Sequence, residues 1–225
     1  MRLEAEGLGK RYFRQSGEAN CFFAVREASL SLKEGCLTVL TGRSGSGKTT
    51  LLHMLSGLLQ PTEGRVTLDG QDLYDMNDEA LSQKRNRCIG VVPQGKSLLD
   101  ALTVMENILL PQTLYGAVGN REEAEKWLQK LGIASLADAM PGELSGGELR
   151  RAAIARAMAG SPDILLADEP TGDLDDENTA LVFRLFREAA DSGKAVLIVT
   201  HEGDALQYAD SAFRMENGRL MPVEK

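Results

Sequence analysis

The stretch TGRSGSGKTT, residues 41–50, constrains the fold of this chain more than any other segment. It satisfies the pattern G-x-x-x-x-G-K-[ST], in which glycines let backbone N–H groups surround an anion, lysine reaches the terminal phosphates and threonine suits Mg²⁺. An ordinary glycine turn needs neither side chain. An apolar, β-prone run precedes the loop and a helical pattern follows it, so the helix N-terminus is expected to face the phosphate. The predicted phosphate contacts are Gly42, Arg43, Ser44, Gly45, Ser46, Gly47, Lys48, Thr49 and Thr50.

Composition limits the classes of function open to the chain. Its 225 residues suffice for one domain, and its start, MRLEAEGLGKRY, lacks the apolar core of a secretory signal. No run of 18 apolar residues is present to span a membrane. Three cysteines without metal-ligand spacing suit free thiols in a reducing cytosol. A net charge of −8 argues against broad nucleic-acid binding, which needs a basic surface.

Short apolar runs alternate with helical patterns along the chain. The runs at residues 36–40, 89–92, 164–167 and 195–200 are nearly continuous rather than alternating. Such strands are typical of a parallel sheet covered by helices on both faces, so we predict an α/β fold, a P-loop NTPase core with a mainly parallel sheet. Residues 28–32 and 65–68 predict a small antiparallel β portion, and residues 14–20 an exposed loop.

The segment from about residue 98 to 145 has a helical pattern. Residues 103–106 have the form of a capping box, and residues 121–131 place Trp127, Leu128 and Leu131 on one face that we predict to be core. The expected organisation is one domain over residues 1–225. Residues 1–97 and 146–225 form its α/β core, and residues 98–145 form an inserted helical subdomain.

Two acidic residues, Asp168 and Glu169, follow the apolar run at 164–167 directly. Carboxylates at the end of a buried strand are costly unless they have partners, and the carboxyl ends of parallel strands form the ligand-binding edge of such a sheet. Asp168 is therefore predicted to hold Mg²⁺ and Glu169 to polarise the water that attacks the γ-phosphate. The alternative is that the pair caps the following turn.

Gln94 and His201 each follow another predicted strand, so both are expected at the same edge of the sheet. The amide oxygen of Gln94 can contribute to the Mg²⁺ site, and the ring of His201 can donate a hydrogen bond to a phosphate. A histidine at a strand end also commonly serves a structural role.

A second glycine-containing stretch, LSGGE, opens the long helical pattern at 149–158. A serine and two glycines at a helix start offer a hydroxyl and free N–H groups to another anion. One nucleotide rarely needs two such sites from one molecule, so we predict that two copies share their nucleotides. The residues expected to contact the other copy's nucleotide are Ser145, Gly146, Gly147 and Glu148.

These motifs, in this order and over nearly the whole chain, resemble the ATP-binding cassette of ABC transporters. GRSGSGKT is similar to its Walker A motif, Gln94 to its Q-loop residue, LSGGE to its signature, ILLADE to its Walker B motif, GDLD to its D-loop and His201 to its H-loop. P-loop kinases and small GTPases lack LSGGE. Tyr12 matches the family's aromatic residue that stacks on adenine; Phe13 is its nearest rival, and a packing role is the alternative. Cys36 and Leu149 depart from the family's usual residues without removing a phosphate or metal ligand.

The resemblance implies an ATPase with ATP and Mg²⁺ as cofactors and with Glu169, His201 and Lys48 as catalytic residues. It further implies a head-to-tail dimer that binds two ATP molecules between its copies. This dimer would power a separate integral-membrane permease subunit. The cassette would be cytoplasmic and peripheral on the inner face of the cell membrane. ADEPTGDLD is similar to the group serving lipoprotein release, macrolide and peptide efflux, and cell division. One alternative is a mechanical regulator of a cell-wall enzyme acting through a membrane partner. Another is a soluble nucleic-acid-associated ATPase, which fits neither the length nor the acidic balance.

Apolar residues that follow Gln94 suggest where a membrane partner docks. Leu98, Leu99, Leu102 and Val104 offer side chains that could line a groove for a partner's helix. The alternative is that they pack the helical subdomain.

Overall fold

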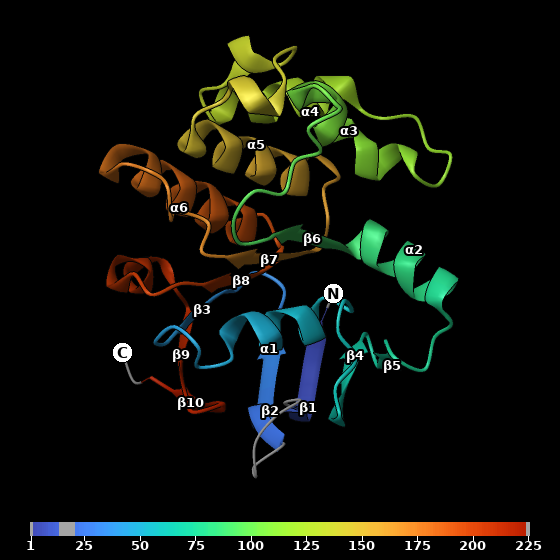
Figure 1. The fold of residues 1–225 in the computed structure, drawn as a ribbon, viewed down its shortest axis with the longest axis vertical. Helices are drawn as coiled ribbons and strands as arrows, with labels where there is room; N and C mark the ends of the chain where they lie inside the picture. Colours follow the sequence, from blue (N-terminus) through green and yellow to red (C-terminus); the bar gives the residue numbers. More distant parts are fainter. Residues whose placement is uncertain (1, 14–20, 224–225) are drawn as a thin grey trace.

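The computed structural model describes residues 2–13 and 21–223, and the loop predicted at 14–20 lies outside the described residues. The chain forms two sheets with helices on both sides of the larger one (Figure 1). The strands are β1 (Leu3–Phe13), β2 (Cys21–Leu32), β3 (Leu37–Thr41), β4 (Glu63–Leu68), β5 (Gln71–Asp72), β6 (Ile89–Val92), β7 (Ile164–Asp168), β8 (Ala195–Val199), β9 (Ser211–Glu216) and β10 (Arg219–Pro222). The α-helices are α1 (Lys48–Leu55), α2 (Asp78–Cys88), α3 (Val104–Thr113), α4 (Arg121–Lys130), α5 (Gly146–Ala159) and α6 (Asp176–Asp191). Within the described residues, three 3₁₀ helices span Ala134–Leu136, Pro141–Glu143 and Gly203–Tyr208.

The larger sheet has the order β10-β9-β3-β8-β7-β6, and all its pairs except β10 with β9 are parallel. Every residue of β7 and β8 is buried, as their continuous apolar sequences require. Successive side chains point to opposite faces, so Leu165 packs into the cluster under α5 and α6, whereas Leu166 packs toward α1 and the second sheet. The predicted α/β class with a mainly parallel sheet is confirmed.

The second sheet is antiparallel, with the order β2-β1-β4-β5. It contains both predicted segments, 28–32 within β2 and 65–68 within β4. Its central strand, β1, was not predicted. The pairing of β1 with β2 shifts register between Ala5 and Leu8, and Gly7 in this interval has a φ of 58°, so the apolar residues of the strand do not alternate.

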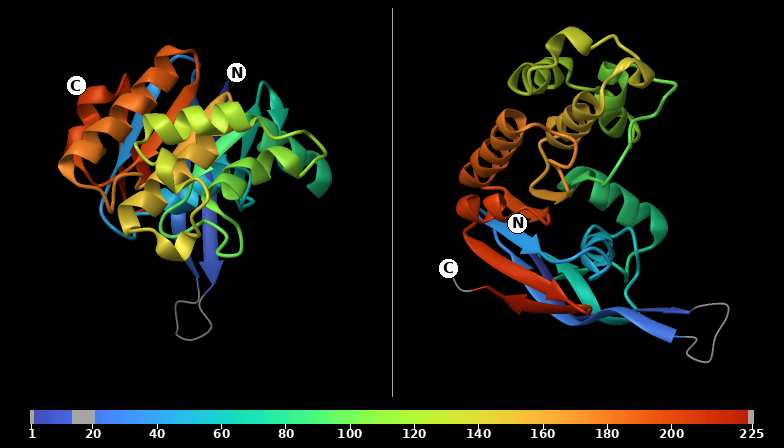
Figure 2. Two further views of the ribbon diagram at one scale, coloured as in Figure 1. Left: turned by 90° about the horizontal axis from the view of Figure 1, so that it is seen from above. Right: turned by 60° about the vertical axis from the view of Figure 1, so that its left-hand side comes forward.

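The helical region lies at the end of the molecule remote from β1 and β2 (Figure 2). Thr103 caps α3 through the predicted capping box with Glu106. Leu128 and Leu131 are buried as predicted, and Trp127 packs partly buried against the same cluster. The division into a core at 1–97 and 146–225 and an insert at 98–145 stays a prediction. Among residues 2–13 and 21–223, no helix has the length and apolar character needed to cross a bilayer.

The proposed docking residues differ in their exposure. Val104 is 0% exposed and belongs to the core beneath α3, so its inclusion in a surface groove is wrong. Its side chain shares the inward face of α3 with Ile108, four residues on. Leu98 packs partly buried against the same core, whereas Leu99 is 49% exposed.

Candidate active site

The phosphate loop connects the end of β3 to the first residue of α1. Gly47 at its end has a φ of 107°, and a Cβ added there would lie 2.1 Å from the carbonyl oxygen of Ala24, so only glycine fits. The buried Lys48 amine donates to the carbonyl oxygens of Gly42 at 2.7 Å and Arg43 at 3.1 Å. The lysine thereby curls back over the loop that precedes it.

The turn between β9 and β10 supports this loop from behind. The N–H of Gly218 donates to the carbonyl oxygen of Ser46 at 3.1 Å, and the carbonyl oxygen of Gly218 accepts from the N–H of Arg26 at 2.7 Å. The Ser46 hydroxyl is buried and has no hydrogen-bond partner in the part of the chain that the structure describes. A buried polar atom without a partner is costly.

Oxygen ligands meet beside the loop. The Thr49 hydroxyl donates to Oδ2 of Asp168 at 2.7 Å, and Asp168 is the buried last residue of β7. The pKa of Asp168 is raised, chiefly because the carboxyl group is buried. The hydrogen bond from Thr49 and the charge of Lys48 offset part of this rise. Mg²⁺ prefers hard oxygen donors, and three are present here. The Thr49 hydroxyl and the Asp168 carboxylate are in contact, and Gln94, whose amide has the third oxygen, lies in the wall of the same cavity. A cation there would also offset the desolvation of the carboxylate, so the residues fit the ion.

Glu169 has an unusual backbone conformation. Its φ of 49° is uncommon for a residue with a side chain and is held by its N–H, which donates to the carbonyl oxygen of Val199 in β8 at 2.8 Å. Backbone strain of this kind tends to collect at functional sites. Its Oε2 atom lies 2.9 Å from Nδ1 of His201, so the ends of β7 and β8 bring the two predicted catalytic side chains together.

The signature residues form a closed helix cap. The Ser145 hydroxyl donates to Oε2 of Glu148 at 2.7 Å, and the N–H of Ser145 donates to the same oxygen at 2.8 Å. These bonds lower the pKa of Glu148. The predicted helix start is confirmed. None of residues 145–148 lines the cavity beside the phosphate loop within the described chain, so one molecule does not bring the signature to its own phosphate loop.

One cavity of about 1170 Å³ contains most of the predicted site residues. Of Tyr12 and Phe13, Tyr12 lines it, whereas Phe13 is 75% exposed and does not. Gly42, Arg43 and Ser46 do not line it. The predicted residues in its wall are Tyr12, Ser44, Gly45, Gly47, Lys48, Thr49, Thr50, Gln94, Asp168, Glu169 and His201.

The wall also contains residues that the sequence did not reveal. Phe22 and Phe23 lie near the start of β2, and the rings of Tyr12 and Phe22 stack with centroids 5.7 Å apart. Their signal was the FF pair itself, since aromatic residues favour strands. Arg150 was also missed, because a helical pattern says nothing about how deep an arginine lies. Asp173 belongs to the quoted GDLD motif but was not predicted as a site residue.

Comparison with known proteins decides the family. A sequence profile described as ABC transporter matches residues 25–172. The chain belongs to the ABC transporter family. This membership confirms the predicted ATPase and excludes the ordinary glycine turn as well as the kinases and small GTPases.

Several relatives match the cassette over most of its length. The lipoprotein-releasing system ATP-binding protein LolD of Maricaulis maris is 40% identical over 223 residues, 98% of this chain and 96% of that protein. The macrolide export ATP-binding/permease protein MacB of Chlorobium luteolum is 39% identical over 203 residues, 90% of this chain and 31% of that protein. The ATP-binding cassette MJ0796, solved as a dimer in a post-hydrolysis state with ADP and Pi, superposes with a TM-score of 0.91 at 32% identity and covers 99% of each chain.

Proposed function

We propose that the cassette binds ATP with Mg²⁺ in the cavity beside the phosphate loop and that Glu169 is the general base of its hydrolysis. This proposal rests on the observation that Thr49, Asp168, Glu169 and His201 all line the cavity beside the phosphate loop, with Thr49 in contact with Asp168 and His201 in contact with Glu169. The family membership establishes ATP hydrolysis, and this geometry supports the assignment of roles within it.

Each side chain has a task that its position supports. The amine of Lys48 exchanges its carbonyl partners for phosphate oxygens, and the Tyr12 ring stacks on the base. Thr49, Asp168 and Gln94 hold the ion; Mg²⁺, when bound, neutralises charge on the phosphate oxygens. The Glu169 carboxylate takes a proton from a water molecule while the oxygen of that water bonds to the γ-phosphorus. The bond between the γ-phosphorus and the oxygen that bridges it to the β-phosphate breaks, and ADP leaves. His201 orients Glu169 through the contact between its Nδ1 atom and the carboxylate.

We further infer that two copies share two nucleotides, with Ser145 to Glu148 of one copy facing the phosphates of the other. This inference is supported by the position of these residues outside their own cavity and by the dimeric state of the cassette MJ0796. A head-to-tail pair would complete each site.

The cassette would power a separate integral-membrane permease from the cytoplasmic face of the membrane. The functions for which LolD and MacB are named, lipoprotein release and macrolide export, support export or extrusion of a lipoprotein or peptide as the transported process. Purification of the tagged chain from membranes, followed by mass spectrometry, tests this proposal. We expect a permease subunit; a regulator of a cell-wall enzyme or a nucleic-acid partner would contradict it.

The variant Glu169→Gln tests the catalytic proposal. It keeps the shape of the side chain but removes the base, so ATPase activity should fall by about 100-fold or more while ATP still binds. The variant should then accumulate as a dimer in size-exclusion chromatography with Mg-ATP. Glu188→Gln, on the exposed face of α6 and paired with Lys130, is the matched control and should keep the parent rate. Parent activity in Glu169→Gln would show that another group is the base.

A further inference from the structure

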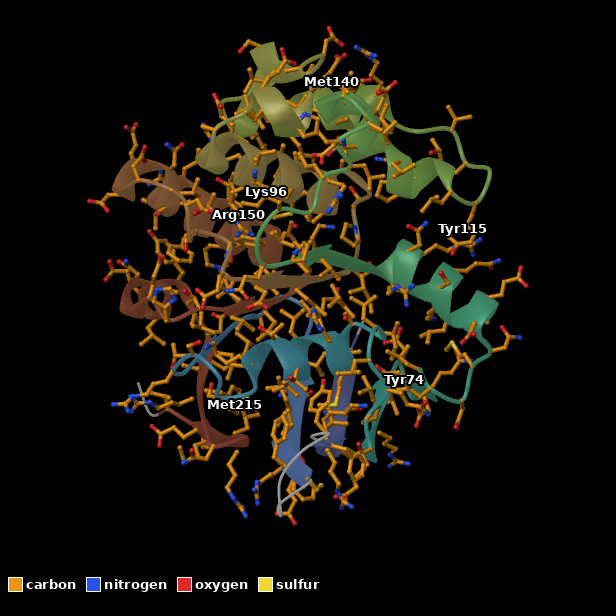
Figure 3. All side chains as sticks on the ribbon, in the orientation of Figure 1. Tyr74, Lys96, Tyr115, Met140, Arg150 and Met215 are labelled. Atoms are coloured by element: carbon orange, nitrogen blue, oxygen red, sulfur yellow. The ribbon has the colours of Figure 1, made fainter. Side chains whose placement is uncertain are left out.

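Arg150 is a buried cation in the wall of the nucleotide cavity with no role in the scheme above. It lies in the first half of α5 and is 5% exposed. Figure 3 shows it between α5 and the central sheet. Arginine is rarely so buried unless it is paired, so its partners indicate why the charge is there.

The Arg150 guanidinium joins two loops. Its Nη1 donates to the carbonyl oxygen of Pro93 at 2.7 Å, directly before Gln94, and its Nη2 lies 3.9 Å from Oδ2 of Asp173. Pro93 follows β6, whereas Asp173 follows β7 and Glu169. Arg150 thus contacts both the loop that contains Gln94 and the loop that follows Glu169.

A second arginine of α5 holds the other end of the same loop. Arg156 donates from Nη1 to the carbonyl oxygen of Ser97 at 2.8 Å and from Nη2 to its hydroxyl at 3.0 Å. Between the two anchors lie Gln94, Gly95 and Lys96, and the φ of 74° at Gly95 lets the chain turn. Both ends of segment 93–97 are therefore fixed to α5.

The two arginines differ in whether carboxylates lie near the guanidinium group. Burial lowers the pKa of Arg150, while Asp173, Asp168 and Glu169 act in the opposite direction. Burial also lowers the pKa of Arg156, which does not line the cavity. Arg150 and Arg156 can therefore be compared with each other, because both bind segment 93–97 but only Arg150 also interacts electrostatically with Asp173, Asp168 and Glu169.

We propose that Arg150 is a positioning residue for ATP hydrolysis, which fixes Gln94 through Pro93 and ties the loop of Asp173 to α5. This inference rests on the proposed roles of Gln94 and Glu169. Loss of Arg150 leaves the phosphate loop and the aromatic wall intact but frees both loops beside the reacting phosphate. A change of this kind lowers kcat and leaves the KM for ATP nearly unchanged.

Steady-state ATPase kinetics of the full chain with Mg-ATP test the proposal. Arg150→Gln should lower kcat by about 10- to 100-fold, with KM and the ATP dissociation constant within about threefold of the parent values. Arg150→Lys keeps the charge and reaches one partner, so it should recover part of the loss. Arg156→Gln frees the far end of the loop only and should lower kcat by less than Arg150→Gln does.

Asp173→Asn gives an independent measurement, since the Asp173 side chain is 62% exposed and its replacement should not disturb folding. It should lower kcat, and the double variant with Arg150→Gln should lower kcat, relative to the parent, by less than the product of the two single effects. Parent kcat in either Arg150→Gln or Asp173→Asn overturns the proposal, as does a raised KM at unchanged kcat. Failure of Glu169→Gln to lose activity would instead overturn the catalytic scheme, so the two failures are distinguishable.

Discussion

Nδ1 of His201 lies 2.9 Å from Oε2 of Glu169, and the two residues follow adjacent parallel strands. An ionised carboxylate can only accept a hydrogen bond, so we assign the ring proton to Nδ1. This contact fixes the direction of the Glu169 side chain and leaves Nε2 of His201 free for another partner.

Replacement of His201 by alanine should lower kcat by about 10- to 100-fold, because Glu169 loses the contact that orients it. The KM for ATP should change by less than about threefold, since the phosphate loop is untouched. Steady-state kinetics measure both quantities. Glu188→Gln, on the exposed face of α6, is the control and should keep the parent kcat; an equal loss there would point to a general effect of substitution.

Removal of the Thr49 hydroxyl should weaken the binding of Mg²⁺ at the site that the oxygen ligands form. Because Thr49 donates to Asp168 at 2.7 Å, Thr49→Ala should raise the Mg²⁺ concentration for half-maximal activity by at least about tenfold. Thr49→Ser keeps the hydroxyl and should stay near the parent value. A titration of ATPase activity with MgCl₂ compares the three proteins, and equal midpoints would exclude Thr49 from the ion site.

Leu99 and Val104 form a matched pair for the docking surface. Leu99→Asp should leave thermal unfolding and ATP binding unchanged but reduce recovery of the membrane partner in co-purification. Val104→Asp places a charge in the core beneath α3 and should unfold the chain or lower its melting temperature strongly. If Leu99→Asp recovers as much partner as the parent, docking takes place elsewhere.

The hydroxyl of Tyr74 lies 2.7 Å from the carbonyl oxygens of both Met54 and Leu59, and burial raises its pKa. It pins the end of α1 to the segment that follows. Tyr74→Phe removes the hydroxyl that these two carbonyls share, while the Met54 carbonyl keeps the N–H of Gly57 at 3.3 Å. The change should destabilise the fold by about 1 kcal/mol, or about 2–4 °C in Tm. Differential scanning calorimetry measures the shift, and kcat should stay at the parent value.

The cap at the start of α5 predicts a pH dependence of stability. The folded pKa of Glu148 is lowered from 4.5 by its bonds to Ser145, so its contribution is present above the unfolded value and is lost as the pH falls through the folded one. Glu148→Ala should therefore melt at a lower temperature than the parent at neutral pH, by about 2–4 °C. Well below the folded pKa the two Tm values should converge. A constant difference at all pH values would point to helix propensity instead.

The sequence predicted those elements whose local pattern and environment agree. The strands β3, β6, β7 and β8 are buried on both faces, so their apolar runs are continuous, and the phosphate loop needs its own residue types. β1 was missed because its register shifts near Gly7 disrupt alternation. The inclusion of Val104 in a surface groove was wrong because proximity in sequence to Gln94 does not fix the direction of a helical side chain.

The missed part of the site depends on contacts between distant segments. Arg150 and Pro93 are 57 residues apart, and their hydrogen bond follows from the packing of α5 over β6. Phe22 reaches the cavity because β2 pairs with β1 and brings it against Tyr12. No local pattern reports either relationship.

The phosphate loop is held in shape by bonds from its own chain, through the amine of Lys48 and through Gly218 behind Ser46. Ordering a flexible backbone costs about 1–2 kcal/mol of conformational entropy per residue, and here that ordering accompanies folding. Nucleotide association therefore carries a small ordering penalty in the loop. Its heat-capacity change, measured by calorimetry at several temperatures, should accordingly report the burial of the base against Tyr12 and its neighbours rather than the folding of a disordered segment.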